Sequence, residues 1–381
     1  MRILQIAPFY PPHVGGIEFH VEALSRQLVE GGHEVVVYTS RVPKTTRSET
    51  VHGVQVCRFA APLLPLNNPF MPGLLLALLR SGGFDVVHTH GHFQTSSTFA
   101  VLSNVFRRRP MVLTCHGAIL EYKGWKRAVE VIFNRSIGRW TLRSVDRVVA
   151  LTPTQADILQ ALGAPLEKTV VIPSWVEMPR ADSRVDGEGF RMAHRLVGKK
   201  VVLFVGRLLP VKGLNYLIEA AKQAETRPTV VIIGDEAPGY AGCLESLLQQ
   251  VKRLELEERV LFLGRFARED LEAAYEGADL FVLPSLGEGL PMVLLEAMAH
   301  GKCAVGTDVP GNRDVIKDGW NGALVEARKP AELARKIDAL LGDDNLRASL
   351  GAQARRDIGR DYTCDAVMKK ILDLYEDVRG H

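Results

Sequence analysis

The sequence predicts an α/β protein made of two doubly wound, Rossmann-like domains that face one another across a cleft. Three observations lead to this prediction. Short runs rich in β-branched residues alternate with longer amphipathic stretches, which is the pattern of βαβ units and parallel sheets. The alternation stops at a polar segment, residues 173–189, and then starts again. The chain of 381 residues is also too long for one compact core of the usual size.

In the first half, each predicted strand is a short apolar run and each predicted helix is a longer segment with an apolar stripe. The strands are expected at Arg2–Ile6, Glu34–Thr39, Val54–Arg58, Asp85–His88, Met111–Cys115, Arg147–Ala150 and Val170–Ile172. The helices are expected at Gly16–Glu30, Pro72–Ser81, Thr95–Phe106, Lys123–Leu142 and Thr154–Leu162. The remaining segments, such as residues 41–53 and 60–73, are expected to be loops.

A break in composition separates the two halves. Residues 173–189 read PSWVEMPRADSRVDGEG, with two prolines, several charges and little apolar content, as in an interdomain linker. We therefore expect an N-terminal domain over residues 1–175, a linker over 176–189 and a C-terminal domain over 190–362. A last helix, 363–381, is expected to pack back on the N-terminal domain.

The second half repeats the pattern of strands and helices. The strands are expected at Lys200–Val205, Thr229–Ile233, Val260–Leu263, Leu280–Leu283, Cys303–Gly306 and Ala323–Val325. The helices are expected at Leu214–Ala224, Leu244–Leu254, Arg268–Tyr275, Met292–His300, Pro330–Leu341, Asn345–Ile358 and Asp365–Val378.

Composition and charge exclude several classes of protein. With 46% hydrophobic and 24% charged residues, the chain is neither disordered nor fibrous. Its 47 Lys and Arg against 44 Asp and Glu give a net charge of +3, so we expect no nucleic-acid partner. Residues 1–175 carry +7 and residues 176–381 carry −4. This asymmetry indicates either an anionic partner of the first half or a chance imbalance on solvated faces.

Cysteine spacing and hydropathy bear on the location of the protein. The five cysteines are far apart and form no CxxC pair, which favours reduced thiols in a cytoplasm over disulfides or a structural zinc site. The N-terminal MRILQIAPFYPP is expected to be a strand and not a signal peptide. The most apolar window, 62–79, is broken by Pro65, Pro69 and Pro72, so it cannot form a membrane span of about 20 residues. We expect a cytoplasmic protein, or one that lies on the inner face of a membrane.

Two segments supply groups that could bind anions. Gly15 and Gly16 open the first long helix, where the backbone N–H groups and the positive helix end favour an anion, although a tight turn explains the pair equally well. Arg207 follows a buried strand, and Lys212 stands where the next helix begins. Both cations therefore point from the same sheet edge, and together they could hold a diphosphate without a metal ion.

The most specific segment contains two carboxylates. Glu288 lies in the loop SLGEGLP after a strand, and Glu296 lies about two helical turns further on. Pro291 suits the first turn of this helix and Gly301 suits its C-terminal cap. Two carboxylates near two cations suit a ligand with phosphates at one point and hydroxyl groups on either side.

These motifs, taken together, resemble a known family. The segment EGLPMVLLEAMAHG resembles the E-x7-E segment of the family 4 retaining glycosyltransferases, which have the GT-B fold. The segments PPHVGGIE, THGHF, TCHG, VGRLLPVKG and GNRDVIKDGWNGALV are similar to the same family in the same order. The resemblance covers essentially the whole chain. It implies transfer of a hexose-type sugar from a nucleoside-diphosphate sugar, UDP- or GDP-linked, to a hydroxyl of a glycan or of a lipid-linked acceptor.

The resemblance also implies catalytic roles. Arg207 and Lys212 would neutralise the departing diphosphate, Glu288 would contact hydroxyls of the transferred sugar, and His116 would face that sugar. His90 would lie near the acceptor. Members of the family usually need no divalent metal or other cofactor, which agrees with a site where fixed cations stabilise the leaving group.

A further set of residues would hold the donor. Gly16 would let the pyrophosphate sit against the first helix, Glu296 would accept hydrogen bonds from the ribose, and the segment 264–266 would lie near the base. The expected donor-binding residues are Gly15, Gly16, Gly206, Gly234, Arg265, Phe266, Gly289, Leu290, Pro291 and Glu296. Two departures from the family pattern are Glu236, where a second glycine is common, and Leu290, where an aromatic residue is common.

Three other signals compete with this interpretation. His88, His90 and His92 alternate as metal ligands can, but hydrogen-bonded strand-end histidines explain them better. Cys115 and His116 are neighbours on a strand and point to opposite faces, so we reject a thiol nucleophile.

The stretch 123–147 is basic, with Arg135, Arg139 and Arg143 on one helix face. With the apolar residues 74–79 and Arg107–Arg109, it could dock on anionic lipid, or it could be a solvated face.

Two alternatives remain open. One is a sugar-nucleotide epimerase or a phosphorylase on the same fold, although no lysine is evident for the pyridoxal phosphate of a phosphorylase. The other is a non-catalytic protein that binds nucleotide sugars. Such a protein would normally have lost one of Arg207, Lys212, Glu288 or Glu296, and all four are present.

Overall fold

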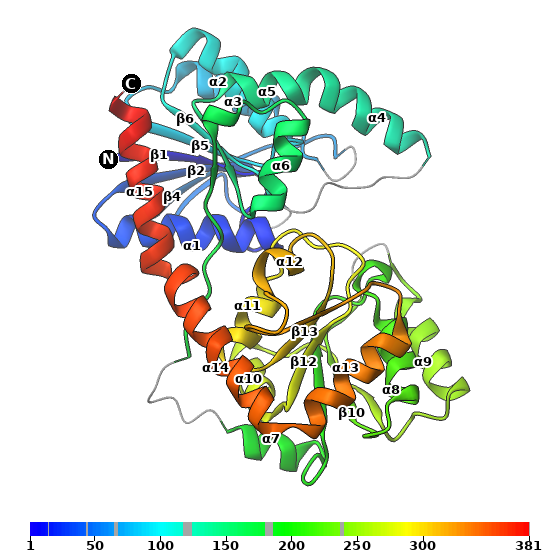
Figure 1. The fold of residues 1–381 in the computed structure, drawn as a ribbon. Helices are drawn as coiled ribbons and strands as arrows, with labels where there is room; N and C mark the ends of the chain where they lie inside the picture. Colours follow the sequence, from blue (N-terminus) through cyan, green and yellow to red (C-terminus); the bar gives the residue numbers. More distant parts are fainter. Residues whose placement is uncertain are drawn as a thin grey trace. The chain divides into compact units, whose positions relative to one another are not determined.

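The computed structural model describes residues 1–13, 15–42, 45–64, 68–116, 124–179, 186–236 and 240–380. The chain forms two compact units (Figure 1). The first consists of Met1–Ser174 together with Val367–His381, and the second consists of Trp175–Ala366. These boundaries lie close to the expected ones, and the last helix belongs to the first unit.

The first unit is built on an eight-stranded sheet with the order β3-β4-β2-β1-β5-β6-β7-β8. The strands are β1 (Arg2–Ile6), β2 (Glu34–Ser40), β3 (Ser48–Val51), β4 (Val54–Phe59), β5 (Val86–His90), β6 (Met111–Thr114), β7 (Arg147–Ala150) and β8 (Thr169–Val171). All neighbouring strands are parallel except β3, which pairs antiparallel with β4. Every residue of β5 and β6 is buried, as expected for strands covered on both faces.

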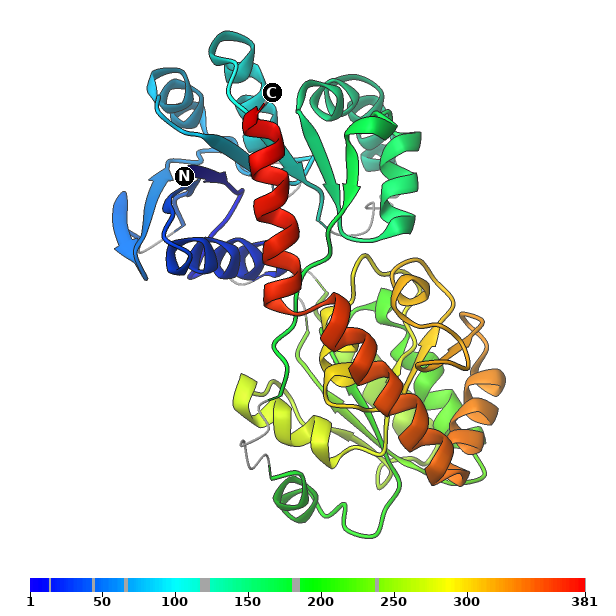
Figure 2. The ribbon, with the colours of Figure 1, turned by 60° about the vertical axis from the view of Figure 1, so that its left-hand side comes forward.

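Helices connect these strands. They are α1 (Gly16–Glu30), α2 (Pro72–Arg80), α3 (Thr95–Arg107), α4 (Trp125–Phe133), the π-helix η2 (Asn134–Gly138), α5 (Arg139–Ser144), α6 (Pro153–Ala161) and the 3-10 turn η3 (Leu166–Lys168). The C-terminal helix α15 (Cys364–Gly380) lies along the first unit (Figure 2), where Val367, Ile371, Tyr375 and Val378 are buried. The chain therefore returns to the first unit at its end.

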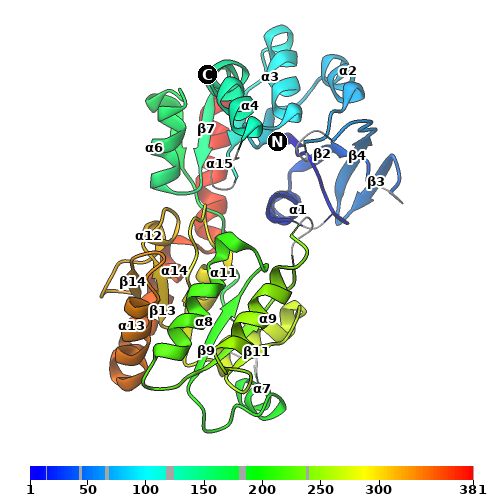
Figure 3. The ribbon, with the colours of Figure 1, turned by 90° about the vertical axis from the view of Figure 1, so that its right-hand side faces the viewer.

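The second unit contains a six-stranded parallel sheet with the order β11-β10-β9-β12-β13-β14. Its strands are β9 (Val201–Val205), β10 (Thr229–Ile233), β11 (Val260–Phe262), β12 (Leu280–Leu283), β13 (Ala304–Thr307) and β14 (Ala323–Val325). Its helices are α7 (Gly187–Ala193), the 3-10 turn η4 (Pro210–Lys212), α8 (Leu214–Gln223), α9 (Cys243–Arg253), α10 (Arg268–Gly277), α11 (Met292–Ala299), α12 (Asn312–Val315), α13 (Pro330–Gly342) and α14 (Asp344–Asp361). Figure 3 shows α8 and α9 in front of this sheet.

Both sheets have a point where the strand order reverses. In the first unit the chain moves outward from β1 through β2, then crosses to β5 on the other side of β1. In the second unit it moves outward from β9 through β10 and β11, then crosses to β12. Open parallel sheets bind ligands beyond the carboxyl ends of the strands at such a point. The loops after β9 and β12 are thus the expected place for a ligand in the second unit.

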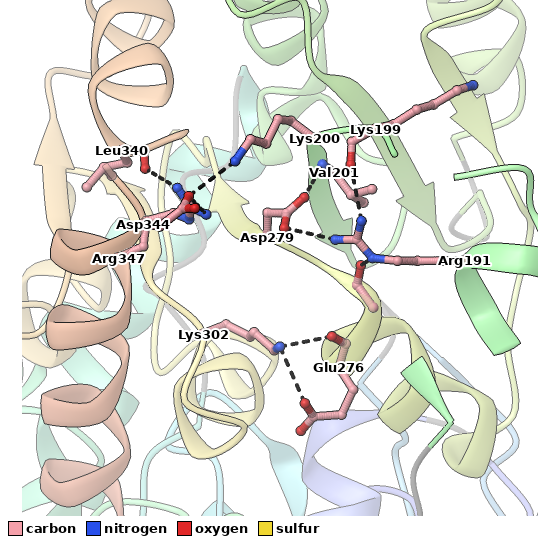
Figure 4. Close-up of polar contacts among 11 residues, drawn as sticks. Arg191, Lys199, Lys200, Val201, Glu276, Asp279, Lys302, Leu340, Asp344 and Arg347 are labelled. Atoms are coloured by element: carbon pink, nitrogen blue, oxygen red, sulfur yellow. Dashed lines mark hydrogen bonds and ion pairs between the residues drawn. The ribbon is translucent and has the colours of Figure 1, made fainter. Parts of the chain in front are cut away.

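At the end of the second sheet away from these loops, polar contacts fix the amino ends of the strands (Figure 4). Asp279 accepts a hydrogen bond from the backbone N–H of Val201 at 2.6 Å and pairs with Arg191 at 2.9 Å. Lys302 donates to the backbone carbonyl of Glu276 at 3.0 Å and pairs with its carboxylate at 3.4 Å. These contacts attach α7 and α10 to the sheet and lie away from the loops that follow β9 and β12.

The structure corrects the prediction in several places. The segment 41–53, expected as a loop, contains β3, whose sequence SETV is too polar to be recognised as a strand. The predicted linker 176–189 includes the start of α7, and α12 was not expected. The single helix predicted at Lys123–Leu142 is interrupted by η2, residue 124 precedes the first helical residue, 125, and residue 123 lies outside the described residues. A π-helix changes the turn without leaving a clear mark in the sequence.

Candidate active site

The loop after β9 carries the two predicted cations of the second unit. Arg207 follows Gly206 and is exposed, and it makes no hydrogen bond or ion pair with any residue that the structure describes. Lys212 ends the short turn η4, directly before α8. Gly213 then adopts φ +67°, and a Cβ at this position would lie 2.1 Å from the carbonyl oxygen of Pro284. Only glycine lets the loop after β9 approach the loop after β12 so closely.

This close approach brings Lys212 and Glu288 together. The Lys212 Nζ donates to Glu288 Oε1 at 2.7 Å, and the two side chains are only 17% and 10% exposed. The Ser285 hydroxyl donates to the same oxygen at 2.5 Å. Both contacts use Oε1, so within the described part of the chain Oε2 of Glu288 has no hydrogen-bond partner. The arrangement therefore offers one carboxylate oxygen and one ammonium group, held in place, to a ligand with hydroxyl and phosphate groups.

Glu296, on α11, lies in a different environment. Its Oε2 accepts a hydrogen bond from the Tyr275 hydroxyl at 2.8 Å. Burial raises the pKa of Glu296, and the hydrogen bond from Tyr275 and the positive charge of Arg268 act against this rise. Burial, together with the charge of Glu296, raises the pKa of Tyr275 well above its usual value, so Tyr275 stays a donor. The carboxylate is thus oriented by a side chain that lies 21 positions earlier in the chain.

The ends of three neighbouring strands are linked by backbone hydrogen bonds. The N–H of Gly206 donates to Ile233 at 2.9 Å, and the N–H of Gly234 donates to Gly264 at 2.8 Å. Gly234 has φ +147°, and a Cβ there would lie 1.9 Å from the carbonyl oxygen of Gly206, so no other residue fits. Glu236 accepts a hydrogen bond from the N–H of Leu244 at the start of α9, at 2.7 Å. Glu236, which replaces a common glycine, therefore has a local structural role.

The other predicted donor-binding residues are spread around this loop cluster. Arg265 is exposed, whereas Phe266 contacts the rings of Phe190 at 6.3 Å and His194 at 5.9 Å between centroids. Phe266 therefore packs against α7. Leu290 packs partly on the core, and Pro291 is buried at the position before the first residue of α11. The carbonyl oxygen of Gly289 is so close to Gly311 that a Cβ at position 311 would lie 2.1 Å from it. The loop before α12 therefore lies directly against this segment.

In the first unit, the predicted histidines are hydrogen-bonded to one another. His116 Nε2 and His90 Nδ1 are 2.9 Å apart, and His90 Nε2 is 2.7 Å from Gln5 Oε1. His20 packs edge-on against His116, with ring centroids 4.7 Å apart. Burial lowers the pKa of each of these histidines, to about 4 for His20 and well below 6.5 for His90 and His116. The cluster is therefore neutral at neutral pH.

The role expected for His90 needs correction. His90 is fully buried, and both of its ring nitrogens are engaged, with Gln5 and with His116. It is therefore not available to an acceptor, and His116 is the more exposed end of the pair. His90 is the last residue of β5, which is why a role near the acceptor was expected, but its side chain points into the core of the unit.

The start of α1 also differs from the simple expectation of an open anion site. A Cβ on Gly15 would lie 2.3 Å from a carboxylate oxygen of Glu18, so this carboxylate lies at the helix start. Glu18 is buried and accepts a hydrogen bond from His13 Nδ1 at 2.8 Å. Within 4 Å of a Cβ on Gly16, by contrast, there is no atom of the described residues. The positive end of the helix is thus partly neutralised by its own side chain.

The histidine cluster is the place where described residues could hold a metal ion. Ring nitrogens of His20, His90 and His116 lie within 4.8 Å of one another. The His90–His116 hydrogen bond uses two of these nitrogens. His92, which alternates with His88 and His90 in sequence, is not part of this cluster. Burial raises the pKa of Cys115 to about 12, which agrees with rejecting a thiol nucleophile.

Sequence reasoning missed the partners of the predicted site residues. Tyr275, which orients Glu296, and Ser285, which orients Glu288, had no assigned role. Gln5 and His20, which hold the histidine pair in the first unit, were not singled out either. Apart from Ser285, these partners are between 21 and 96 positions away along the chain, and no local pattern marks them.

The chain matches two family models. Glycosyltransferase Family 4 matches residues 14–180, and Glycosyl transferases group 1 matches residues 190–357. A D-inositol 3-phosphate glycosyltransferase of Geodermatophilus obscurus is 32% identical over 95% of this chain and 84% of its own length. An uncharacterised glycosyltransferase of Methanocaldococcus jannaschii is 28% identical over 99% of this chain and 98% of its own length.

Solved structures share the fold. HepE of Anabaena, in complex with UDP, has a TM-score of 0.83 and 21% identity, with 99% of this chain and 100% of that chain covered. Sucrose-phosphate synthase of Thermosynechococcus elongatus has a TM-score of 0.80 and 21% identity, with 100% and 99% covered. The two sheets (parallel except for β3), the motifs at their strand ends and the matched relatives agree. The chain belongs to the family 4 glycosyltransferases and is a glycosyltransferase with the GT-B fold.

Proposed function

We propose that this enzyme transfers a hexose-type sugar from a nucleoside-diphosphate sugar to a hydroxyl group of its acceptor, with retention of the anomeric configuration and without a divalent metal. The observation that carries the proposal is the fixed group of Lys212, Glu288 and Ser285 in the loops after β9 and β12. Exposed Arg207 lies in the first of these loops. The group combines cations for a diphosphate with a carboxylate for sugar hydroxyls.

The proposed reaction makes one bond and breaks one. The bond between the anomeric carbon and the phosphate oxygen breaks, so positive charge grows on the sugar ring and negative charge on the diphosphate. Lys212 and Arg207 stabilise that negative charge. The acceptor oxygen bonds to the same face of the anomeric carbon, and its proton passes to the departing phosphate oxygen. No carboxylate nucleophile is required by this route, and Glu288 and Glu296 are left to hold the two sugars of the donor.

The donor is proposed to be UDP- or GDP-linked. HepE has been solved with UDP-glucose, and this chain shares its fold at 22% identity and a TM-score of 0.80. Several relatives of this chain are D-inositol 3-phosphate glycosyltransferases. A phosphorylated polyol is therefore one acceptor class to test, next to glycans and lipid-linked sugars.

A surface of the first unit supports a membrane-bound acceptor. It is formed by α2, α3, α4, η2 and α5, of which α2 packs against α3 and α3 against α5. Phe106 and Ile132 are 74% and 67% exposed there. The other exposed apolar residues are Leu76, Leu102, Val105, Val129, Ile137 and Trp140. The exposed arginines of these helices and their ends are Arg80, Arg107, Arg108, Arg127, Arg135, Arg139 and Arg143.

Apolar side chains flanked by arginines suit the interface of an anionic bilayer. Within the described residues, no helix is both long enough and apolar enough to cross a membrane. We propose that this surface holds the enzyme on anionic lipid. Sedimentation with phosphatidylglycerol vesicles at low salt tests it, with phosphatidylcholine vesicles as the reference. Replacing Arg135, Arg139 and Arg143 by glutamine should abolish binding, whereas replacing exposed Lys252, Arg253 and Arg335 of the second unit should not.

The transfer reaction is tested in two steps. A thermal-shift panel of UDP-, GDP- and ADP-sugars identifies the donor, because a ligand that binds only the folded state raises the melting temperature. Slow hydrolysis of the best binder, followed by proton NMR of the released sugar, gives its anomeric configuration. Release of the inverted anomer contradicts retention. Interconversion of the donor to its epimer, without release of the nucleotide, indicates an epimerase instead, and binding without turnover of any acceptor class indicates a binding protein.

A further inference from the structure

His116 is the end of a chain of hydrogen bonds whose direction follows from the orientation of the Gln5 amide. Gln5 Oε1 can only accept, so His90 Nε2 donates to it, at 2.7 Å. Because His90 is neutral, its Nδ1 carries a lone pair, and His116 Nε2 must be the donor in the 2.9 Å contact between them. This makes His116 the Nε2–H tautomer. Its Nδ1 then keeps a lone pair, and within the described residues this atom has no hydrogen-bond partner.

The other end of the chain is set by the C-terminal helix. The Gln5 amide nitrogen donates to the hydroxyl of Tyr375 on α15, at 3.1 Å. That hydroxyl in turn lies 2.6 Å from His88 Nδ1, and His88 Nε2 lies 2.7 Å from the Thr114 hydroxyl. Because the Gln5 amide nitrogen faces Tyr375, the Tyr375 hydroxyl accepts from it, and the hydroxyl proton can go to His88 Nδ1. The hydroxyl is thus the acceptor that the Gln5 amide uses in this orientation. The amide orientation then fixes the tautomers of His90 and His116.

The burial of this chain indicates that it does more than fill the core. Gln5, His90 and Tyr375 are fully buried, and His88 and Thr114 are 2% exposed. They come from strands β1, β5 and β6 and from α15, whose other buried positions are apolar except for Thr89. Apolar side chains of the same shape would stabilise such a core about equally well. A polar chain that ends at the partly exposed His116 instead specifies the state of that one imidazole.

We propose that Tyr375 is a positioning residue, which holds His116 in one tautomer and one ring orientation through Gln5 and His90. This inference rests on the proposed function, in which His116 faces the transferred sugar. The lone pair on Nδ1 of His116 can then accept a hydrogen bond from a hydroxyl of that sugar. His20, packed edge-on at 4.7 Å, restricts the same ring from a second side. The last helix of the chain thereby helps to hold His116 in the tautomer that can bind the sugar.

The test compares two matched tyrosine variants of the full chain. Tyr375→Phe removes the hydroxyl that connects Gln5 to His88 and keeps the ring in the core. Tyr38→Phe is the control, because Tyr38 lies in the same sheet and, within the described residues, has no hydrogen bond or ring contact with the histidine chain, while its hydroxyl is near Ser81. The tautomers are read from the ring ¹⁵N and ¹H shifts of ¹⁵N-histidine-labelled protein. This reading needs no substrate, so it stands even when no donor is turned over.

Three outcomes are informative. The wild-type protein and Tyr38→Phe should show a single Nε2–H tautomer for His116, and Tyr375→Phe should show a mixture. In the transfer assay, Tyr375→Phe should lower kcat by about tenfold and change the KM for the donor by less than about twofold, because orientation and not binding is lost. An unchanged His116 tautomer in Tyr375→Phe, or an Nδ1–H tautomer in the wild type, overturns the inference. If Tyr375→Phe shows a mixture of His116 tautomers but the wild-type protein transfers no sugar, the inference stands and the proposed function is contradicted.

Discussion

Acidification should destabilise the first unit far more than the second, because the first unit buries neutral histidines. Burial lowers the pKa of His20 and His92 to about 4 and that of His88 to about 3. It also lowers the pKa values of His90 and His116. In the unfolded chain these groups titrate near 6.5. Below that pH the unfolded state binds more protons than the folded state, so the free energy of unfolding falls as the pH falls.

The size of the effect follows from these pKa values. Between pH 7.5 and pH 5, a histidine whose pKa changes from 6.5 to 4 or 3 on folding loses about 2 kcal/mol of stabilising free energy. His20, His88 and His92 together therefore lose about 6 kcal/mol, which is comparable with the whole stability of an ordinary domain, about 5–15 kcal/mol. His90 and His116 act in the same direction. The first unit should thus be close to unfolding at pH 5.

Hydrogen exchange followed by mass spectrometry measures this for each unit in the same sample. After correction for the intrinsic exchange rates, the opening free energies of core peptides give separate stabilities at each pH. The second unit is the internal control, because His194 and His300 are its only histidines in the sequence. In the first unit, the slope of the opening free energy against pH corresponds to the number of protons taken up on unfolding. His92→Gln should reduce this slope by about one proton, or about 1.4 kcal/mol per pH unit. A first unit that loses no more stability than the second between pH 7.5 and pH 5 would refute the reasoning.

Three further predictions concern the second unit. Lys212→Met should leave the Glu288 carboxylate without its cationic partner, with only the Ser285 hydroxyl still bonded to it, and should lower the stability of this unit by about 2 kcal/mol in denaturant melts. Adding Glu288→Gln should restore the stability but not the transfer of sugar, as measured by product formation. Tyr275→Phe should weaken the binding of the nucleotide sugar about 5- to 10-fold by calorimetry, because Glu296 loses the hydroxyl that orients it and its pKa rises further. Unchanged affinity would show that Glu296 does not bind the nucleotide sugar. Asp279→Ala should lower the unfolding free energy by about 2–3 kcal/mol while donor affinity stays the same, since its contacts lie at the opposite edge of the sheet, and a loss of affinity would contradict this placement.

Much of the fold could be predicted because buried parallel strands are continuous apolar runs. Strands β1, β7, β10, β12 and β14 have the predicted limits, and the limits of the other predicted strands differ by one or two residues. What escaped prediction lacks such a run. The edge strand β3 reads SETV, since one face of an antiparallel edge strand meets solvent. The π-helix η2 lies between α4 and α5, at a place that no sequence pattern marks.

The candidate site was predicted in part, for a similar reason. The glycines and the pair Lys212 and Glu288 lie at strand ends, and parallel topology brings the ends of neighbouring strands β9 and β12 to one edge. The direction of each side chain was less predictable. His90 was expected near an acceptor and lies in the core, and Glu18 occupies the helix start that was expected to be open. Both depend on packing between segments that are not adjacent in sequence.

The sequence by itself determined the order of strands and helices, the family and the residue types that can bind a sugar diphosphate. These depend on periodicity and on motifs, in which the informative residues are close together along the chain. Only the tertiary structure decided which groups meet: Tyr275 with Glu296, and Tyr375 with Gln5 across 370 positions. The physical reason is that a hydrogen bond requires its two atoms within about 3 Å of one another. For residues far apart in sequence, the pairing of the strands and the return of the last helix set this distance.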